Sequence, residues 1–424
     1  MKVLLLNPPI TYDTPQAPLG LMMLHASLKE RHDVTILDLN FALDREKLRS
    51  LNADVIGISC MTFQRDLVIE IAKLMKEDGL FIVVGGAHPT ISPKEMLKHP
   101  CIDYVIRGEG EHAFSQLLNA LEEDSPLNGV ANLGYRKNDR VQLNLVEEIE
   151  DLNSLPFPSY DALDMHRYAT REPTSTVDVP YETARGCPFN CIFCCVNRMR
   201  GSYRAMSLDR VFSDIEKILD LHQADSILLN FFDNNFTFSR ERSLEFCDRL
   251  RDIPGNSRIK WMCSARADEL DHALIRKMSN AGAVKIFIGG ESGYDHGLKM
   301  IQKRVSIAQI KDAVKACLRY RIRAEVGFII GFPWEKKKDI LRTLSTAMEL
   351  EKIGAITGLY KCVPYPATPL WRHLEERNIK IDSSRSSDFD FFADKLVFDH
   401  PYIANSDLNS TVRALLDHKM PLEI

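Results

Sequence analysis

The sequence predicts an α/β protein in which two successive alternations of strands and helices build two parallel sheets. Short apolar runs recur along the 424 residues, and a segment with helical periodicity follows most of them. The apolar runs show little polar alternation, which indicates strands that helices cover on both faces. The first alternation therefore predicts a doubly wound parallel sheet. The second predicts a further sheet, followed by a short C-terminal segment.

The first alternation starts with the apolar run KVLLL at 2–6, which Asn7-Pro8-Pro9 closes. Each later apolar run is separated from the next by a helical pattern, as in parallel strands joined by crossover helices. The expected strands are 2–6, 34–40, 54–60, 80–86 and 104–111, and the expected helices are 19–31, 64–78, 93–98 and 112–123.

Small and polar residues gather where these strands end. In doubly wound sheets, ligands bind beyond the carboxyl ends of the strands, in the loops that follow them. Glycine there lets a ligand approach the backbone closely, and serine, threonine or acidic side chains can hydrogen-bond to it. The candidate ligand contacts are Pro8, Ser59, Gly85, Gly86, His88 and Glu109.

Residues 125–180 are rich in proline and read as an irregular connection, for example LPFPSYDAL at 155–163. From Tyr181 the alternation resumes, and the C-terminal tail contains a polar loop, SSRSSDFDFF at 383–392. The expected division is 1–130, a linker at 131–175, a second domain at 176–370 and a segment at 371–424 that shapes a substrate pocket. The expected strands start with YETARG at 181–186 and continue at 226–233, 260–266, 285–291, 324–331 and 355–366, with helices at 207–222, 239–252, 271–281, 306–320 and 336–351.

The run RGCPFNCIFC at 185–194 places Cys187, Cys191 and Cys194 on one short loop. Three thiolates are one ligand short of a closed zinc site or of an electron-transfer 4Fe-4S cluster. Gly186 and Pro188 indicate a loop rather than core packing, although buried cysteine is common. The spacing therefore predicts a metal cluster with one open position. Cys195 follows the last ligand and is expected to pack or, alternatively, to act as a substitute ligand.

This cysteine spacing resembles that of the radical S-adenosylmethionine (SAM) enzymes. The resemblance implies a 4Fe-4S cluster whose open iron binds SAM, and an electron that cleaves SAM to a 5'-deoxyadenosyl radical. It also implies a partial (β/α)6 barrel for the second domain, with the functional groups at the carboxyl ends of its strands.

The first domain resembles the Rossmann-like cobalamin-binding domain that precedes the radical domain in one class of these enzymes. The resemblance rests on PQAPLGLMMLHASLKE at 15–30, Gly-x-Ser after the third strand, GGAHPT at 85–90 and GEGE at 108–111. The motif Asp-x-His-x-x-Gly is absent, so no histidine of that motif is the lower cobalt ligand. His25 and His88 remain candidates, and His25 is better explained as a histidine on a helix face.

The same resemblance assigns SAM contacts to the strand ends of the second domain. Phe193 would lie against adenine, Asp233 and Asn234 would bind the methionyl ammonium, and Arg266 would clamp the carboxylate. The other two contacts are Glu291, for ribose hydroxyls or the ammonium, and Gly331, whose backbone would meet adenine.

Structural alternatives exist for several of these residues. Asp233, Asn234 and Asn235 could instead form an Asx turn with a helix cap. Arg266 and Glu291 could form a mutual salt bridge across the barrel mouth. Ala367 stands where related sequences usually have glycine, which would suit a backbone with positive φ.

Composition narrows the class of function. The formal net charge is −5, with 45% hydrophobic and 27% charged residues, which argues against a nucleic-acid-binding protein. No apolar stretch reaches the length of a membrane span, and the N-terminus does not resemble a signal peptide. Ten cysteines in such a chain favour thiols and metal binding over disulfides. We therefore expect a cytoplasmic enzyme with a small-molecule substrate.

The expected function is that of a cobalamin-dependent radical SAM methyltransferase, which moves a methyl group from methylcobalamin to an unactivated carbon of a small metabolite or biosynthetic intermediate. An electron donor such as flavodoxin or ferredoxin would be its partner. One alternative keeps the cofactors (4Fe-4S cluster, SAM and cobalamin) but catalyses rearrangement, cyclisation or oxidation. A second is a redox sensor that binds cobalamin and an iron–sulfur centre.

Overall fold

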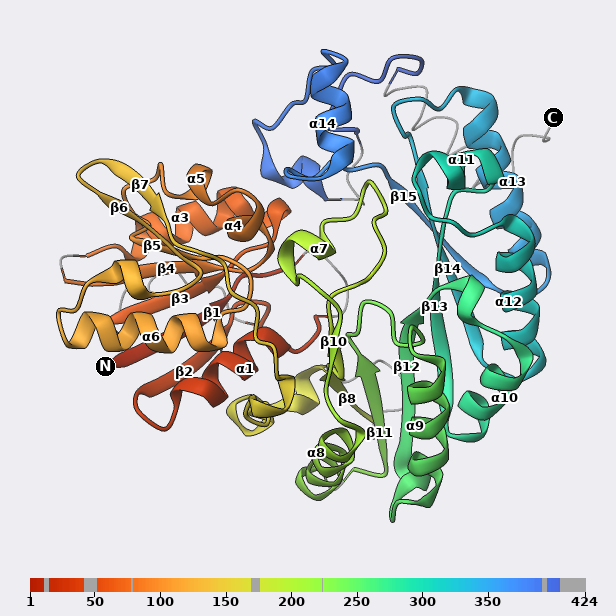
Figure 1. The fold of residues 1–424 in the computed structure, drawn as a ribbon, viewed down its shortest axis with the longest axis horizontal. Helices are drawn as coiled ribbons and strands as arrows, with labels where there is room; N and C mark the ends of the chain where they lie inside the picture. Colours follow the sequence, from red (N-terminus) through yellow and green to blue (C-terminus); the bar gives the residue numbers. More distant parts are fainter. Residues whose placement is uncertain are drawn as a thin grey trace. The chain divides into compact units, whose positions relative to one another are not determined.

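The described residues form two large sheets, one in each of two units (Figure 1). The computed structural model describes residues 1–10, 15–41, 52–77, 79–168, 176–222, 224–390 and 395–404. The first unit is Met1–Pro180 with Cys195–Ser207, and the second is Tyr181–Cys194 with Leu208–Ile424. The division into four segments that the sequence suggested stays a prediction.

The sheet of the first unit has the strand order β2-β1-β3-β4-β5-β6-β7. Its first five strands pair in parallel, as expected. Because β1 lies between β2 and β3, the connections on its two sides run in opposite directions, and this creates a switch point at the carboxyl ends of β1 and β3. The parallel strands are β1 (Lys2–Asn7), β2 (Asp33–Asp38), β3 (Val55–Ser59), β4 (Phe81–Gly85) and β5 (Tyr104–Ile106).

Helices cover both faces of this sheet. Leu4 and Leu6 of β1 belong to the buried cluster that includes residues of α3 (Arg65–Met75). On the other face, a side chain at Gly57 would collide with Phe114 of α6 (Glu111–Glu122), so glycine lets α6 pack close to the sheet. Helix α1 (Leu19–Leu28) packs beside α6. Two short helices, α4 (Ala87–Ile91) and α5 (Pro93–Met96), connect β4 to β5.

An antiparallel hairpin extends the first sheet and corrects one expectation. Residues 125–180 were expected to be irregular, but β6 (Leu133–Lys137) and β7 (Arg140–Leu143) form a hairpin whose β6 pairs antiparallel with β5. The hairpin turns at Asn138 and Asp139, which both have positive φ, as a two-residue hairpin turn requires. Residues 169–175 of the expected linker lie outside the described residues.

The sheet of the second unit has the strand order β15-β14-β13-β12-β11-β8. Neighbouring strands from β11 to β15 pair in parallel and in chain order, which is the pattern of an open barrel. The first strand of this sheet is β8, which ends at Tyr181, the first residue of the expected range 181–186. Within the rest of that range only Ala184–Arg185 form a strand, the short β9, which is not part of this sheet. The strands are β8 (Thr176–Tyr181), β11 (Ser226–Phe231), β12 (Ile259–Ala265), β13 (Ala283–Glu291), β14 (Arg323–Ile330) and β15 (Ile356–Lys361).

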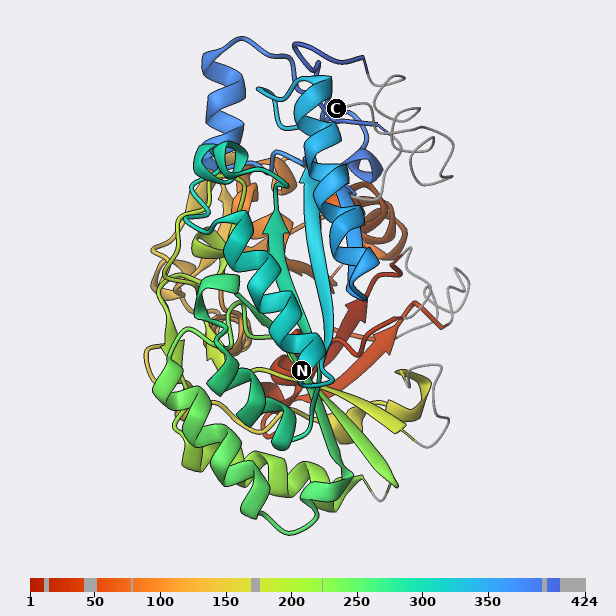
Figure 2. The ribbon, with the colours of Figure 1, turned by 90° about the vertical axis from the view of Figure 1, so that its right-hand side faces the viewer.

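Five helices connect successive strands of this sheet and cover one of its faces (Figure 2). An aromatic cluster fixes one of them: Phe246 of α9 packs on Phe231 and Trp261, and Trp261 donates its indole N–H to the Ala281 carbonyl at 2.8 Å. The helices are α8 (Leu208–Leu221), α9 (Arg240–Asp252), α10 (His272–Asn280), α12 (Ile307–Arg319) and α13 (Lys337–Lys352).

The segment after β15 contains α14 (Pro369–Glu376), which Thr368 caps by accepting from the Trp371 N–H. Within the expected loop at 383–392, Ser386–Phe389 form a short 3-10 helix, η8, whereas 391 and 392 lie outside the described residues. In the part of the chain that the structure describes, no helix combines the length and apolarity that a membrane crossing requires.

Ala367 adopts a left-handed backbone with φ of 65°, which confirms that this position favours glycine. Such a conformation costs an L-residue roughly 1–2 kcal/mol. We expect Ala367→Gly to raise the free energy of unfolding by up to about 1 kcal/mol, because the relieved strain exceeds the extra entropy of glycine. Chemical denaturation followed by circular dichroism measures this change.

Gly255→Ala is the matched control, since Gly255 is also left-handed, with φ of 80°, and a Cβ there meets Leu219 at 3.7 Å, an ordinary contact. It should lower the free energy of unfolding by about 1 kcal/mol. Equal losses in the two variants would contradict the strain argument.

Candidate functional site

The cysteine loop follows β8 and is pinned in its middle by backbone hydrogen bonds. The Ile192 N–H donates to the Ile301 carbonyl at 3.2 Å, and the Leu370 N–H donates to the Ile192 carbonyl at 2.9 Å. Ile301 follows α11 (Asp295–Met300), and Leu370 lies in α14. Segments distant in sequence thus hold the loop that carries Cys187, Cys191 and Cys194.

All ten cysteines are thiols, and these three are partly exposed. The loop therefore presents three thiols that can bind metal. Within the described ranges, however, no group of three or more His, Cys, Asp or Glu residues stands close enough together to hold a metal ion. The thiol donor set and its exposure fit a cluster, and the ligand assignment stays a prediction. Cys195 lies 3.8 Å from the Met199 sulfur, in keeping with a packing residue.

A buried ion pair lies beside the cysteine loop. Lys303 donates to Oε1 of Glu291 at 2.9 Å, and Lys303 is only 7% exposed. Burial by itself would lower the pKa of Lys303, but the negative charges of Glu291 and Cys191 raise it above its ordinary value. Glu291 ends β13 with φ of 60°, and a side chain at Gly289 would collide with both partners. One carboxylate oxygen of Glu291 is thus already held by a lysine.

Arg266 does not form the mutual salt bridge with Glu291 that the sequence left open. Its guanidinium binds Asp268 through two N–H groups at 3.0 and 2.9 Å and donates to the Lys303 carbonyl at 2.7 Å. It also lies 3.7 Å above the ring of Phe189 in the cysteine loop. Arg266 therefore braces the loop against β12, and its expected role as a carboxylate clamp stays a prediction.

The polar run after β11 is mostly turned inward. Asp233 is buried and accepts from the backbone N–H and the hydroxyl of Thr183, both at 2.6 Å. Burial raises its pKa to about 6. Asn235 is also buried and donates to Glu269 at 2.9 Å. Of these three residues, only Asn234 is exposed. Hydrogen bonds within the protein, rather than an open set of ligand groups, thus account for Asp233 and Asn235.

The loop after β14 contains a buried glutamate that the sequence reasoning missed. Glu335 is fully buried, and its Oε2 accepts from the N–H groups of Gly331 and Phe332 at 2.7 and 3.0 Å. Tyr294 donates to its Oε1 at 3.3 Å. Glu335 therefore uses the Gly331 N–H that could otherwise meet a ligand. Its position two residues after Pro333 in the run GFPWE was the available signal.

Phe193 lies near Phe332, with ring centroids 6.2 Å apart in an edge-on arrangement. Phe332 in turn stacks on Trp334, with centroids 5.2 Å apart. The cysteine loop and the loop after β14 thus share an aromatic face. The contact between Phe193 and adenine stays a prediction.

Three glycines stand side by side on adjacent strands. Gly289 of β13 pairs with Gly327 of β14, which pairs with Gly358 of β15. A side chain at Gly327 would lie 2.8 Å from the Phe287 ring and 3.2 Å from the Tyr360 ring. The missing side chains leave room for these two rings to lie against the strands.

In the first unit, hydrogen bonds join the loops at the carboxyl ends of the strands. The Cys60 N–H donates to the Gly85 carbonyl at 2.8 Å, and the His88 N–H donates to the Cys60 carbonyl at 3.0 Å. Gly86 has φ of 102°, and a Cβ there would lie 3.1 Å from the Cys60 backbone. Thr90 links this pair to the next loop, because its hydroxyl donates to the Gly86 carbonyl and accepts from the Gly108 N–H.

At the switch point of this sheet, Gln64 connects two loops, a contact that the sequence reasoning did not identify. Gln64 donates to the carbonyls of Pro8 and Pro9 at 3.1 and 3.0 Å, and so ties the loop after β1 to the start of α3. Ser59 ends β3 at this point and is partly exposed, and Gly86 is exposed. The structure therefore brings Pro8, Ser59, Gly85 and Gly86 to one edge, as expected.

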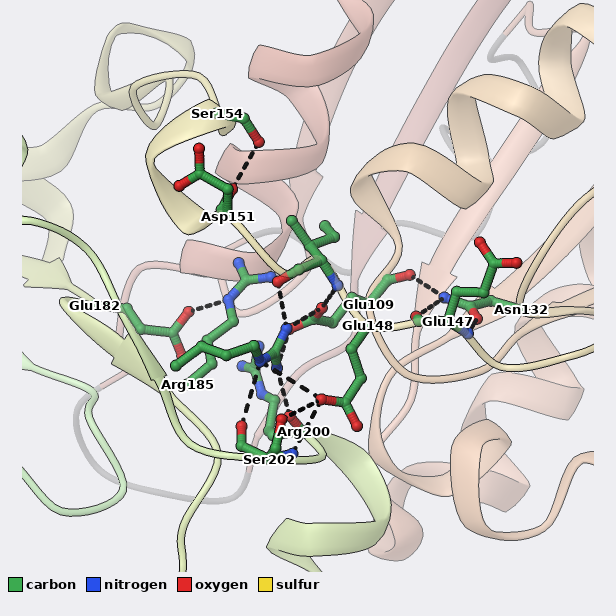
Figure 3. A network of polar contacts seen from close by, with 12 residues as sticks. Glu109, Asn132, Glu147, Glu148, Asp151, Ser154, Glu182, Arg185, Arg200 and Ser202 are labelled. Atoms are coloured by element: carbon green, nitrogen blue, oxygen red, sulfur yellow. Dashed lines mark hydrogen bonds and ion pairs between the residues drawn. The ribbon is translucent and has the colours of Figure 1, made fainter.

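The side chains of His88 and Glu109 each lie against a charged side chain of the protein. His88 is 1% exposed, and its Nε2 lies 3.4 Å from Glu95, an ion-pair distance. Glu109, which is labelled in Figure 3, is buried and forms an ion pair with Arg204. The cofactor contacts expected of His88 and Glu109 stay predictions. His25 lies partly buried on α1.

Comparisons with known proteins agree with this geometry. A model of the B12 binding domain matches residues 10–118, and the Radical SAM superfamily model matches residues 181–347. An uncharacterized methyltransferase of Pyrococcus horikoshii is 32% identical over 397 residues, which cover 89% of this chain and 84% of that protein.

The anaerobic magnesium-protoporphyrin IX monomethyl ester cyclase of Cereibacter sphaeroides is 28% identical over 351 residues. The match covers 80% of this chain and 56% of the cyclase. Among solved structures, the cobalamin-dependent S-adenosylmethionine radical enzyme OxsB has a TM-score of 0.79 at 19% identity, over 98% of this chain and 66% of that one. This last likeness shows the fold.

Gly327→Ala should lower the free energy of unfolding by about 1–3 kcal/mol, because its Cβ would overlap the Phe287 ring. Replacing Phe287 by leucine in the same chain removes part of the overlap. In chemical denaturation, the loss in the double variant should therefore be smaller than the sum of the single losses. Additive losses would show that the glycine is not needed for Phe287.

The buried Glu335 predicts a pH dependence of stability. Burial raises its pKa from 4.5 to about 7. A raised pKa means that the folded state holds the proton more tightly, so the stabilisation is complete below the unfolded pKa and is lost as the pH rises through about 7. The full change is about 3 kcal/mol, since one pKa unit corresponds to about 1.4 kcal/mol.

Glu335→Gln cannot ionise, and its amide oxygen can still accept from the two backbone N–H groups. Between about pH 5 and about pH 8, the wild type should lose stability relative to E335Q in urea denaturation. The control is E349Q, since Glu349 is exposed and pairs with Lys311 on the surface. Parallel pH profiles of wild type and E335Q would refute the assignment.

Proposed function

The chain belongs to the cobalamin-binding radical SAM enzymes, and on this premise we propose that it transfers a methyl group from methylcobalamin to an unactivated carbon of a small metabolite or biosynthetic intermediate. The observation that carries the proposal is the 32% identity to an uncharacterized methyltransferase over 84% of that protein's length. The geometry within each unit supports it, because each has its candidate contacts at the carboxyl ends of parallel strands.

When bound, the 4Fe-4S cluster supplies the electron that cleaves SAM, and cobalamin supplies the methyl group. Cys187, Cys191 and Cys194 would hold the cluster. Glu291, Asn234 and the aromatic face around Phe193 would contact SAM.

The surrounding residues position these contacts. Lys303 holds one oxygen of Glu291 in place. Burial raises the pKa of the Cys191 thiol, and the charge of Lys303 opposes that shift. Asp233 fixes Thr183 at the start of the cysteine loop, and Glu335 fixes the Gly331–Phe332 backbone. These contacts are made before any ligand arrives, which is what preorganised binding requires.

In the first unit, Pro8, Ser59, Gly85 and Gly86 would contact cobalamin at the switch point. The loops there are already joined by backbone hydrogen bonds, so binding would need little ordering. His88 is buried beside Glu95, so we do not assign it to cobalamin. We further propose a cytoplasmic location and a flavodoxin or ferredoxin as the electron donor.

A second candidate is ring formation or a related oxidation or rearrangement with the same cofactors. The similarity to the cyclase of Cereibacter sphaeroides favours it, although the chain covers only 56% of that protein. The two candidates differ in their products, because methyl transfer consumes a second SAM and yields S-adenosylhomocysteine, whereas cyclisation does not.

The test is anaerobic reconstitution of the full chain with iron, sulfide and hydroxocobalamin, followed by reduction in the presence of SAM. We expect retained cobalamin and both 5'-deoxyadenosine and S-adenosylhomocysteine in mass analysis. 5'-Deoxyadenosine alone would favour the second candidate. If neither product forms, the catalytic proposal is overturned and a redox sensor is the remaining function.

Cysteine variants sharpen this test. Replacing Cys187, Cys191 or Cys194 by alanine should abolish the absorbance of the cluster, because each loss leaves two thiolates. Cys195→Ala is the matched control, since Cys195 packs near Met199. If C195A loses the cluster as completely as the other variants, Cys195 is a ligand and the assignment is wrong.

A further inference from the structure

The boundary between the two units falls inside the cysteine motif. The second unit takes the chain up to Cys194, and the segment Cys195–Ser207 belongs to the first unit. This segment contains α7 (Val196–Met199) and β10 (Arg204–Ala205). Consecutive Cα atoms are about 3.8 Å apart, so whatever holds Cys195 in place also limits where Cys194 can lie.

A buried ion pair holds the segment Cys195–Ser207. The guanidinium of Arg204 meets both carboxylate oxygens of Glu109, at 2.9 and 3.0 Å. The side chains are 10% and 3% exposed. Two parallel N–H···O bonds fix the orientation of both groups as well as their separation. Figure 3 shows Glu109 at the centre of this network.

Both partners make further contacts that fix the pair. Glu109 accepts from the Ile149 N–H at 2.7 Å, and Arg204 donates to the Ile149 carbonyl at 2.6 Å. Arg204 also donates to the Arg200 carbonyl at 2.6 Å, within its own segment. Removal of either charge would leave its buried partner without this two-point ion pair, which is unfavourable.

Two further polar links of the segment lie nearer the surface. Glu148 accepts from the Ser202 N–H and hydroxyl, at 3.1 and 2.6 Å, but its side chain is 40% exposed. Asn153 accepts from the Ser207 N–H at 2.8 Å, also at the surface. The pair of Arg204 and Glu109 is therefore a buried anchor of the segment.

We propose that Arg204 is a positioning residue for Cys194. Through its ion pair with Glu109 it fixes the segment that leaves the third cysteine, and so limits the positions that the Cys194 thiolate can take as a cluster ligand. This inference rests on the proposed function, since it needs Cys194 to be a cluster ligand. It also gives Glu109, at the carboxyl end of β5, a task other than cobalamin contact.

The test compares cluster retention in reconstituted full-length protein. Arg204→Met removes the charge and keeps most of the side-chain length. We expect R204M to lose the cluster absorbance to an iron chelator about ten-fold faster than the wild type, or more, as for other residues that support metal ligands. The electron paramagnetic resonance signal of its reduced cluster should also change, since the third thiolate is displaced.

The control is Arg65→Met, which breaks another ion pair of the same unit, between the buried Arg65 and the 37% exposed Glu95, at 2.9 Å. R65M should lose fold stability but keep the chelation rate and the signal of the wild type. If both variants lose the cluster equally fast, or if R204M retains it like the wild type, the inference is wrong.

Glu109→Gln provides a second route, because it removes the other charge of the pair and keeps its shape. If R204M does not fold, E109Q should show the same faster loss of cluster, and wild-type retention in E109Q would overturn the inference. A wild-type chain that takes up no cluster would refute the proposed function and the inference together. If the wild type takes up the cluster normally and R204M retains it as well as the wild type does, only the inference is refuted.

Discussion

Parallel pairing sends the carboxyl end of every strand to one edge of its sheet, and the rest of the structure depends on this constraint. In both units the loops that gather there carry polar and charged side chains into partly buried surroundings. A charge can be buried at acceptable cost only if it is paired and hydrogen-bonded. The residues at these edges are consequently matched to one another: Lys303 with Glu291, Arg266 with Asp268, and Arg204 with Glu109.

This matching separates residues that hold the site together from residues that can meet a ligand. Asp233 and Glu335 accept backbone N–H groups of the loops on either side of the site, and burial raises the pKa of both. Each fixes a loop instead of presenting its carboxylate outward. The groups proposed for ligand contact are the cysteine thiols, Glu291, Asn234, the aromatic face around Phe193 and the backbone around the glycines. A site built in this way is rigid before its cofactors arrive.

In the first unit, the loops at the carboxyl ends of the strands are fixed mainly by backbone hydrogen bonds. Hydrogen bonds through Cys60, Gly85 and Thr90 join the loops after β3, β4 and β5, and Gln64 ties in the loop after β1. The segment that leaves Cys194 is anchored in this unit by Arg204. The backbone hydrogen bonds tolerate only small residues at the closest approach, which explains the glycine at position 86.

The sequence by itself determined the fold class, the family, most strands of the two parallel sheets and the long helices that cover them, because apolar periodicity and the cysteine spacing are local patterns. It also indicated the left-handed backbone at Ala367. It did not reveal the hairpin of β6 and β7, whose strands are short and half exposed, or the partners of the charged residues. Those partners are far apart in the chain, as with Asp233 and Thr183, 50 residues apart, and Glu109 and Arg204, 95 residues apart. Only the tertiary structure decided which strand-end residues face each other, because burial of a charge selects its partner by position in space and not by position in the sequence.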